Sequence, residues 1–261
     1  MINRRSITKV IAGAGALMLA GLSLSAPAVA DELEAIKKKG EISIAMSGAY
    51  PPFNFVDEEN KVVGFDPAIG TEIAKRMGLE TKIVTTAWDG IIGGLLAKKY
   101  DAIVGSMTIT EERDKVVDFV GPYYATKRAI FTKEGSPITS VKQLDDATLG
   151  VTLGETHEAW AREQGYKIRT YKGLPELMLE LENGRVDAIV NDRIAAMLAM
   201  KKNGYKFVEI EDLVADKFGA GIAIREGNPD LQAAMQKALD EIMADGTYLK
   251  IAEKWVGGDI R

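Results

Sequence analysis

Hydrophobic and polar positions alternate along this chain with two different periods. Residues 41–46 (EISIAM) alternate with a period of two, which predicts a strand. In residues 66–77, Ile69, Ile73 and Met77 share one helical stripe and Gly78 follows, which predicts a helix with a glycine C-cap. Similar signals follow one another to the end of the chain, and this order is typical of the α/β fold class.

The remaining elements are predicted in the same way. We expect strands at 82–84, 101–104, 148–152, 167–171, 187–190 and 221–225, and helices at 88–98, 156–164, 174–183, 192–202, 229–244 and 246–256. The sequence DAIV occurs at 101–104 and again at 187–190, each time after a predicted helix and a polar turn. A chance match is the alternative, but the shared context favours two lobes of similar topology, for which the chain is long enough.

The first thirty residues have the pattern of a secretory signal peptide. Three cations (Arg4, Arg5 and Lys9) precede an uncharged stretch at 10–30, which ends in Ala28-Val29-Ala30. A membrane anchor is the alternative, but the apolar part is short and interrupted by glycines. We therefore expect export with cleavage after Ala30, and a periplasmic protein. The paired arginines are compatible with both the Sec and the twin-arginine route.

Composition excludes several classes of function. The chain has no cysteine and one histidine, His157, so we expect no disulfide, no thiolate chemistry, no metal site and no cofactor. With 33 Lys and Arg against 38 Asp and Glu, the net charge is -5. An acidic protein is a poor partner for nucleic acid, because phosphate binding generally requires a basic face.

Candidate binding residues follow the predicted strands, where ligands bind in open α/β sheets. Arg113 stands in the first turn of a predicted short helix that Thr110 would cap, and a cation is unfavourable there. It is either a surface residue or a bidentate partner for a ligand carboxylate. Ser106 and Thr108 would add hydrogen-bond donors beside it.

The second half of the chain supplies two further candidates. Thr156 opens a predicted helix, and it either caps that helix or donates to the same carboxylate. Asp192 follows a buried strand, and it is either an N-cap or the partner of a ligand ammonium. Tyr50 and Trp88 are either core residues or rings that flank a ligand. Together these residues describe a site for a zwitterionic α-amino acid.

Several of these motifs belong to one known pattern. They are Tyr50-Pro51-Pro52-Phe53, Gly64-Phe65-Asp66, Trp88-Asp89-Gly90, Thr108 to Arg113, Gly121-Pro122-Tyr123-Tyr124 and Gly184 to Asp192. In this order they resemble the polar-amino-acid-binding proteins of ABC importers, bacterial extracellular solute-binding family 3. The resemblance covers essentially the whole mature chain.

The resemblance implies a type II periplasmic-binding-protein fold with two lobes that close on one ligand. Lobe one would comprise 31–124 and 220–261, and lobe two 125–219, with hinges near 123–127 and 216–220. Arg113 would bind the carboxylate and Asp192 the ammonium. The resemblance assigns first-lobe contacts to Ser106 and Thr108, a second-lobe carboxylate contact to Thr156, and the aromatic sandwich to Tyr50 and Trp88. The implied partners are an amino acid and the membrane permease, and we expect a monomer.

Positions 47, 105, 107 and 152 are the candidates for specificity. Relatives that select cationic side chains often carry an aspartate where this chain has Ser47, and glutamine binders carry a lysine where it has Thr152. Gly105 and Met107 belong to the same strand end as Ser106. These departures favour a neutral or sulfur-containing polar amino acid, then an acidic one, over a cationic ligand.

Two other functions fit the same resemblance. Cyclohexadienyl dehydratases share the scaffold but use a glutamate three residues beyond the aspartate that matches Asp192, where this chain has Ala195. Alanine cannot donate a proton, so we do not expect an enzyme. A receptor ectodomain would be joined to a membrane span, and we expect none here, although a loaded binding protein can also present its ligand to a chemoreceptor.

Overall fold

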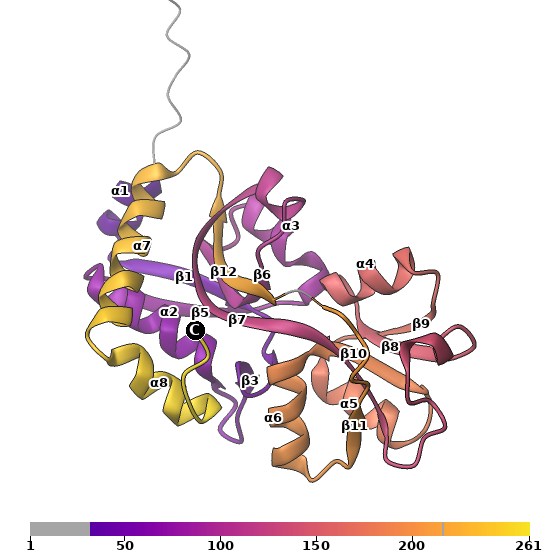
Figure 1. Cartoon of the computed structure of the whole chain (residues 1–261). Coiled ribbons are helices and arrows are strands. Elements are labelled where there is room, and N and C mark those ends of the chain that lie inside the picture. The colour runs from indigo at the N-terminus through magenta and orange to yellow at the C-terminus, as the bar shows by residue number, and fades with distance from the viewer. Residues whose placement is uncertain (1–31, 216) are drawn as a thin grey trace, which may run out of the picture.

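The computed structural model describes residues 32–215 and 217–261, so the predicted signal peptide lies outside the described residues. The fold is mixed α/β, with one long sheet in the strand order β5-β1-β6-β12-β7-β10-β8-β9 and β11 paired to β7 (Figure 1). The α/β prediction is therefore confirmed.

The sheet has two sections. The first section contains β1 (Glu41–Met46), β5 (Glu80–Thr85), β6 (Ala102–Thr108), β12 (Lys217–Arg225) and the first part of β7 (Val117–Lys133). The second contains the last part of β7, β8 (Thr148–Thr152), β9 (Lys167–Tyr171), β10 (Ala188–Asp192) and β11 (Phe207–Glu209). A small separate sheet is formed by β2 (Ala49–Tyr50), β3 (Asn54–Val56) and β4 (Val62–Val63).

Helices cover both sections. Those packed on the first section are α1 (Glu32–Lys39), α2 (Phe65–Arg76), α3 (Ile91–Leu96), α7 (Pro229–Ala244) and α8 (Thr247–Val256). Those on the second are α4 (Thr156–Glu163), α5 (Leu174–Glu182) and α6 (Arg193–Asn203). The described residues also contain three short 3-10 helices: η1 (Trp88–Gly90), η2 (Arg113–Lys115) and η3 (Val141–Gln143). Among the described residues, no helix combines the length and the hydrophobicity needed to cross a membrane.

Strand β7 joins the two sections because it is long enough to belong to both. Its residues 117–127 pair antiparallel with β12, and its residues 128–132 pair antiparallel with β10. Figure 1 shows β7 running from the first group of helices into the second. The repeated DAIV sequences lead into β6 and β10, and each of these strands also pairs in parallel with a neighbour.

The helix predicted at 88–98 is shorter than expected, because it begins as the 3-10 turn η1 and α3 ends at Leu96. Gly94, inside α3, has a packing reason. The hydroxyl group of Tyr100 donates a hydrogen bond to the Ile91 carbonyl, and it occupies the space that a Cβ at Gly94 would need. Glycine at 94 therefore lets the buried Tyr100 ring pack under α3.

A buried ion pair fixes the N-terminal helix to the sheet. Arg225 on β12 is 8% exposed, and its Nε lies 2.8 Å from Oε2 of Glu32. Its Nη1 donates to the carbonyl oxygens of Leu95 (2.7 Å) and Tyr100 (2.6 Å). One guanidinium group therefore holds three segments of the first section together.

We expect Arg225→Ala to lower the free energy of unfolding by about 3–5 kcal/mol, because it leaves two carbonyls without their donor and Glu32 with only the exposed Lys98 as its partner. Arg193→Ala is the matched control: its pair with Glu209 is more exposed, and we expect a loss of about 1 kcal/mol or less. Urea denaturation measures both. Equal losses in the two variants would contradict the role given to Arg225.

Candidate ligand-binding site

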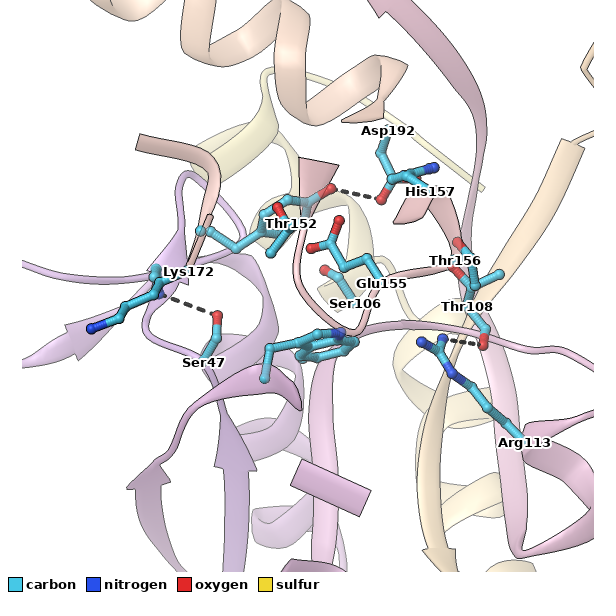
Figure 2. Close-up of a pocket in the computed structure, with 15 residues that line it drawn as sticks. Ser47, Ser106, Thr108, Arg113, Thr152, Glu155, Thr156, His157, Lys172 and Asp192 are labelled. Atoms are coloured by element: carbon cyan, nitrogen blue, oxygen red, sulfur yellow. Dashed lines mark hydrogen bonds and ion pairs between the residues drawn. The ribbon is translucent and has the colours of Figure 1, made fainter. Parts of the chain in front are cut away.

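A pocket lies where the two sheet sections meet. Its lining includes every candidate residue from the sequence except Met107 (Figure 2). The candidates that line it are Ser47, Tyr50, Trp88, Gly105, Ser106, Thr108, Arg113, Thr152, Thr156 and Asp192. Most of them follow or end β1, β5, β6, β8 and β10, while Gly105 and Ser106 lie inside β6 and Tyr50 ends β2. The strand-end rule thus brought together residues far apart in sequence.

Arg113 faces this pocket. The short helix predicted here is only the 3-10 turn η2, in which the Arg113 amide donates to Thr110 Oγ1 at 3.2 Å. The guanidinium Nη1 donates to the Thr108 carbonyl at 2.9 Å, and the group lies 5.8 Å from the Trp88 ring. Burial lowers the pKa of Arg113 from its ordinary value, opposed by the charge of Glu155. Its Nη2 also donates to the Gly154 carbonyl at 3.4 Å, so the arginine is held by two backbone contacts and keeps further N–H groups for an anion.

Asp192 stands on the opposite side of the pocket and does not cap helix α6 through its side chain. Its Oδ2 accepts a hydrogen bond from the Tyr50 hydroxyl at 2.6 Å, and its Oδ1 lies 3.1 Å from Nε2 of His157. Arg128 Nε donates to Nδ1 of His157 at 3.2 Å, so the imidazole proton is on Nε2 and points to Asp192. The Tyr50–Asp192 bond joins β2 of the small sheet to β10 of the second section across the pocket.

The surroundings of Asp192 also affect Tyr50. Burial, together with the Asp192 charge, raises the pKa of Tyr50 well above its ordinary value. The phenol therefore keeps its proton at neutral pH and remains the donor in the bond to Asp192.

Ser106 differs from its expected role as a donor. Its backbone N–H donates to the Tyr123 hydroxyl at 2.7 Å, and its Oγ donates to the Asp66 carboxylate at 2.9 Å. Its φ of 60° turns the strand toward these partners. Burial raises the pKa of Asp66 to about 6, against hydrogen bonds from Tyr123, Asn54 and Ser106 that lower it. At pH 7 the carboxylate is charged, so Ser106 offers the pocket an acceptor oxygen.

Two further predictions need correction. Thr156 is the first residue of α4, and the N-cap position belongs to Glu155. Met107 is fully buried in a core cluster with Ile91 and Leu95. The alternation of side chains along β6 directs it away from its neighbours in the pocket. It does line a wider groove that adjoins the pocket and shares Arg113 and Trp88 with it.

The sequence reasoning missed five residues that line the pocket: Ala49, Glu155, His157, Lys172 and Gly173. Lys172 and Gly173 directly follow β9, and Glu155 follows β8, so the strand-end rule applied to every strand would have found these three. Within the part of the chain described, no group of three or more acidic or histidine side chains is arranged to hold a metal ion.

Two glycines mark points where the sections touch. A Cβ added to Gly173 would lie 2.7 Å from the Ala49 carbonyl oxygen, and one added to Gly154 would lie 2.9 Å from Cα of Asp89. Both distances are shorter than a carbon side chain allows. The second section therefore approaches the first by using residues without side chains on either side of the pocket.

Comparison with known proteins agrees with this arrangement. The L-cystine-binding protein TcyJ of Escherichia coli (strain K12) is 34% identical over 264 residues, covering 99% of this chain and 97% of the relative. The L-arginine-binding protein of Pseudomonas aeruginosa is 34% identical over 263 residues, covering 97% and 98%. The structure of holo ArgBP from T. maritima matches with a TM-score of 0.76 and 35% identity, covering 85% of this chain and 98% of that one.

These likenesses extend over nearly the whole of each compared protein, and the predicted type II periplasmic-binding-protein fold is confirmed. A family model, described as bacterial extracellular solute-binding proteins, family 3, matches residues 42–258. The chain belongs to family 3 of the bacterial extracellular solute-binding proteins.

Proposed function

We propose that this protein is the substrate-binding component of an ABC importer, which captures an α-amino acid and delivers it to a membrane permease. One observation carries the proposal: Arg113 and Asp192, of opposite charge, line the same pocket from different sheet sections. A zwitterion needs a cationic and an anionic partner a short distance apart. The names of the related cystine-binding and arginine-binding proteins support the same class of ligand.

Each end of the ligand has its own partner in this proposal. The α-carboxylate pairs with the free N–H groups of Arg113 and with Thr156 at the start of α4, where helix N–H groups favour an anion. The α-ammonium pairs with Asp192, and the Ser106 hydroxyl oxygen accepts a further hydrogen bond. The rings of Tyr50 and Trp88 flank the apolar part of the side chain.

Binding is coupled to closure of two lobes. We assign residues 31–124 and 220–261 to one lobe and 125–219 to the other, with hinges near residues 123–127 and 216–220. The Tyr50–Asp192 bond and the contacts of Gly154 and Gly173 are then features of the closed state. Closure removes water from the charge pairs and strengthens them.

Export and the absence of catalysis complete the proposal. Cleavage of residues 1–30 releases a periplasmic protein that acts as a monomer with its permease. The position at which a dehydratase would need a proton donor is Ala195, which is fully buried in α6. We therefore expect purified protein to leave prephenate and arogenate unchanged.

We expect Arg113→Ala and Asp192→Ala each to weaken amino-acid binding by about 2–5 kcal/mol, because each leaves a buried ligand charge unpaired. A thermal-shift screen of refolded, dialysed protein against the common amino acids and cystine identifies the ligand. A ligand at about 100 times its Kd adds roughly 2.7 kcal/mol of stability. Titration calorimetry then gives the affinity of each variant.

Arg169→Ala is the control for this experiment, because Arg169 is exposed on β9 and outside the pocket lining. Its affinity should equal that of the wild type. If Arg113→Ala or Asp192→Ala also binds like the wild type, the site assignment is wrong.

We expect Gly173→Ala to weaken binding by about 1–3 kcal/mol, roughly 5- to 150-fold in Kd, because its Cβ meets the Ala49 carbonyl only when the lobes close. Gly93→Ala is the matched control, since a Cβ there meets nothing within 4 Å. Calorimetry gives Kd, and small-angle scattering gives the degree of closure. Wild-type affinity in Gly173→Ala would refute this description of the closed state.

A further inference from the structure

Glu155 places a carboxyl group in the pocket that the proposed binding of a zwitterion does not use. The residue follows β8 and occupies the N-cap position of α4, but its side chain makes no capping hydrogen bond. Its Oε2 is buried and has no hydrogen-bond partner among the described residues, and the same is true of Thr152 Oγ1. Figure 2 shows the Glu155 carboxyl group in the middle of the pocket.

Several charged groups surround Glu155, but none forms an ion pair with it among the described residues. The charged and titratable groups that face it are Arg113, Asp192, His157, Tyr50 and Tyr124, which come from five different elements, and Lys172 also lines the pocket. No ion pair within 4.0 Å joins Glu155 to a cation in the part of the chain that the structure describes.

The neighbours of Glu155 have other partners. His157 accepts a hydrogen bond from Arg128 at Nδ1, so it is the neutral tautomer that donates to Asp192. In the proposed complex, the ligand carboxylate neutralises Arg113. Glu155 then remains as an acid without a counter-ion, in a pocket from which water is removed.

We propose that Glu155 selects ligands that carry a second cationic nitrogen, so that the substrate is a basic or a double-ended diamino acid rather than a neutral one. This inference rests on the function proposed above and names its substrate class. A second ammonium or guanidinium group supplies the counter-ion for Glu155 and a hydrogen bond for its unpartnered Oε2.

Position 47 does not supply such a charge. Ser47 Oγ donates to Oδ1 of Asn54 at 2.9 Å and accepts from the Ala49 amide at 3.2 Å. We predicted a neutral ligand from the sequence because Ser47 stands where an acidic group would bind a cationic side chain. That argument looked for the acidic group at this one position only. Glu155 provides the negative charge from the other side of the pocket.

The selection depends on pH. Burial raises the pKa of Glu155 to about 7, with Asp192 adding to the rise and with His157, Arg113 and Thr152 opposing it. A cationic ligand favours the ionised form, so binding lowers this pKa and releases a proton below neutrality. Affinity for a cationic ligand should therefore increase as the pH rises from about 6 to 8, whereas affinity for a matched neutral ligand should not follow this dependence.

The test compares ligands that differ mainly by the second charge. Titration calorimetry gives Kd for lysine against norleucine, arginine against citrulline, and cystine against S-methylcysteine. The first two pairs report a basic side chain, and the third reports a double-ended amino acid. At pH 8 we expect the wild type to prefer the cationic member of at least one pair by about tenfold or more.

Glu155→Gln and Glu155→Thr should reduce that preference to about twofold or less and abolish its pH dependence. Glu112→Gln is the matched control: Glu112 is exposed, lies in the adjoining groove and should keep the wild-type ratio. Proton release at pH 6.5, measured in two buffers of different ionisation enthalpy, should disappear in Glu155→Gln.

The outcomes separate this inference from the function on which it rests. A wild type that prefers the neutral members, or a Glu155→Gln variant with an unchanged ratio, overturns the selection by Glu155 and leaves amino-acid binding intact. A wild type that binds none of these amino acids overturns both. If Glu112→Gln lost the preference for cationic ligands to the same extent, the preference would arise from the overall electrostatic field of the protein. That outcome would overturn the role proposed for Glu155.

Discussion

The paired strands β7 and β12 are the constraint on which the rest of the structure depends. Both belong to the first section, and β7 continues into the second, where it pairs with β10. Because β10 ends at Asp192 and β6 leads to Arg113, this continuous hydrogen bonding fixes where the two charged side chains can meet. The pocket exists because one sheet is shared by two groups of helices.

Opposite charges organise the pocket, and hydrogen bonds within the protein prepare them. Arg113 is oriented by the Thr108 carbonyl, and Asp192 by Tyr50 and His157. Groups that are already oriented lose less conformational entropy when a ligand arrives. Glu155 is different, because its Oε2 has no such partner among the described residues, and its chemistry is directed at the ligand.

The fold class and much of the pocket lining could be predicted from the sequence, because the period of the hydrophobic pattern and the ends of the strands are local properties of the chain. Asp192 and Arg113 follow buried apolar strands, so their positions at one sheet edge could be inferred without coordinates. The hydrogen-bond acceptors of Ser106 could not be inferred, because Asp66 and Tyr123 lie far from it in the chain. Glu155 was missed because the capping role was predicted for Thr156, and its missing capping bond is seen only in the structure. The burial of Met107 could have been predicted only by following the alternation of side chains along β6 residue by residue.

The hydrogen bond between Tyr50 and Asp192 has a consequence for transport. It crosses the pocket through protein groups alone, so it contributes to the free energy of closing even when no solute is bound. A ligand shifts the equilibrium only by its differential affinity for the two states, and a protein that supplies part of the closing free energy needs less from its ligand. The same bond raises the population of empty closed protein, which competes with loaded protein for the permease. The strength of one phenol–carboxylate hydrogen bond therefore balances two effects. A stronger bond favours binding of the solute at low concentration, and it also favours unproductive binding of the empty closed protein to the permease.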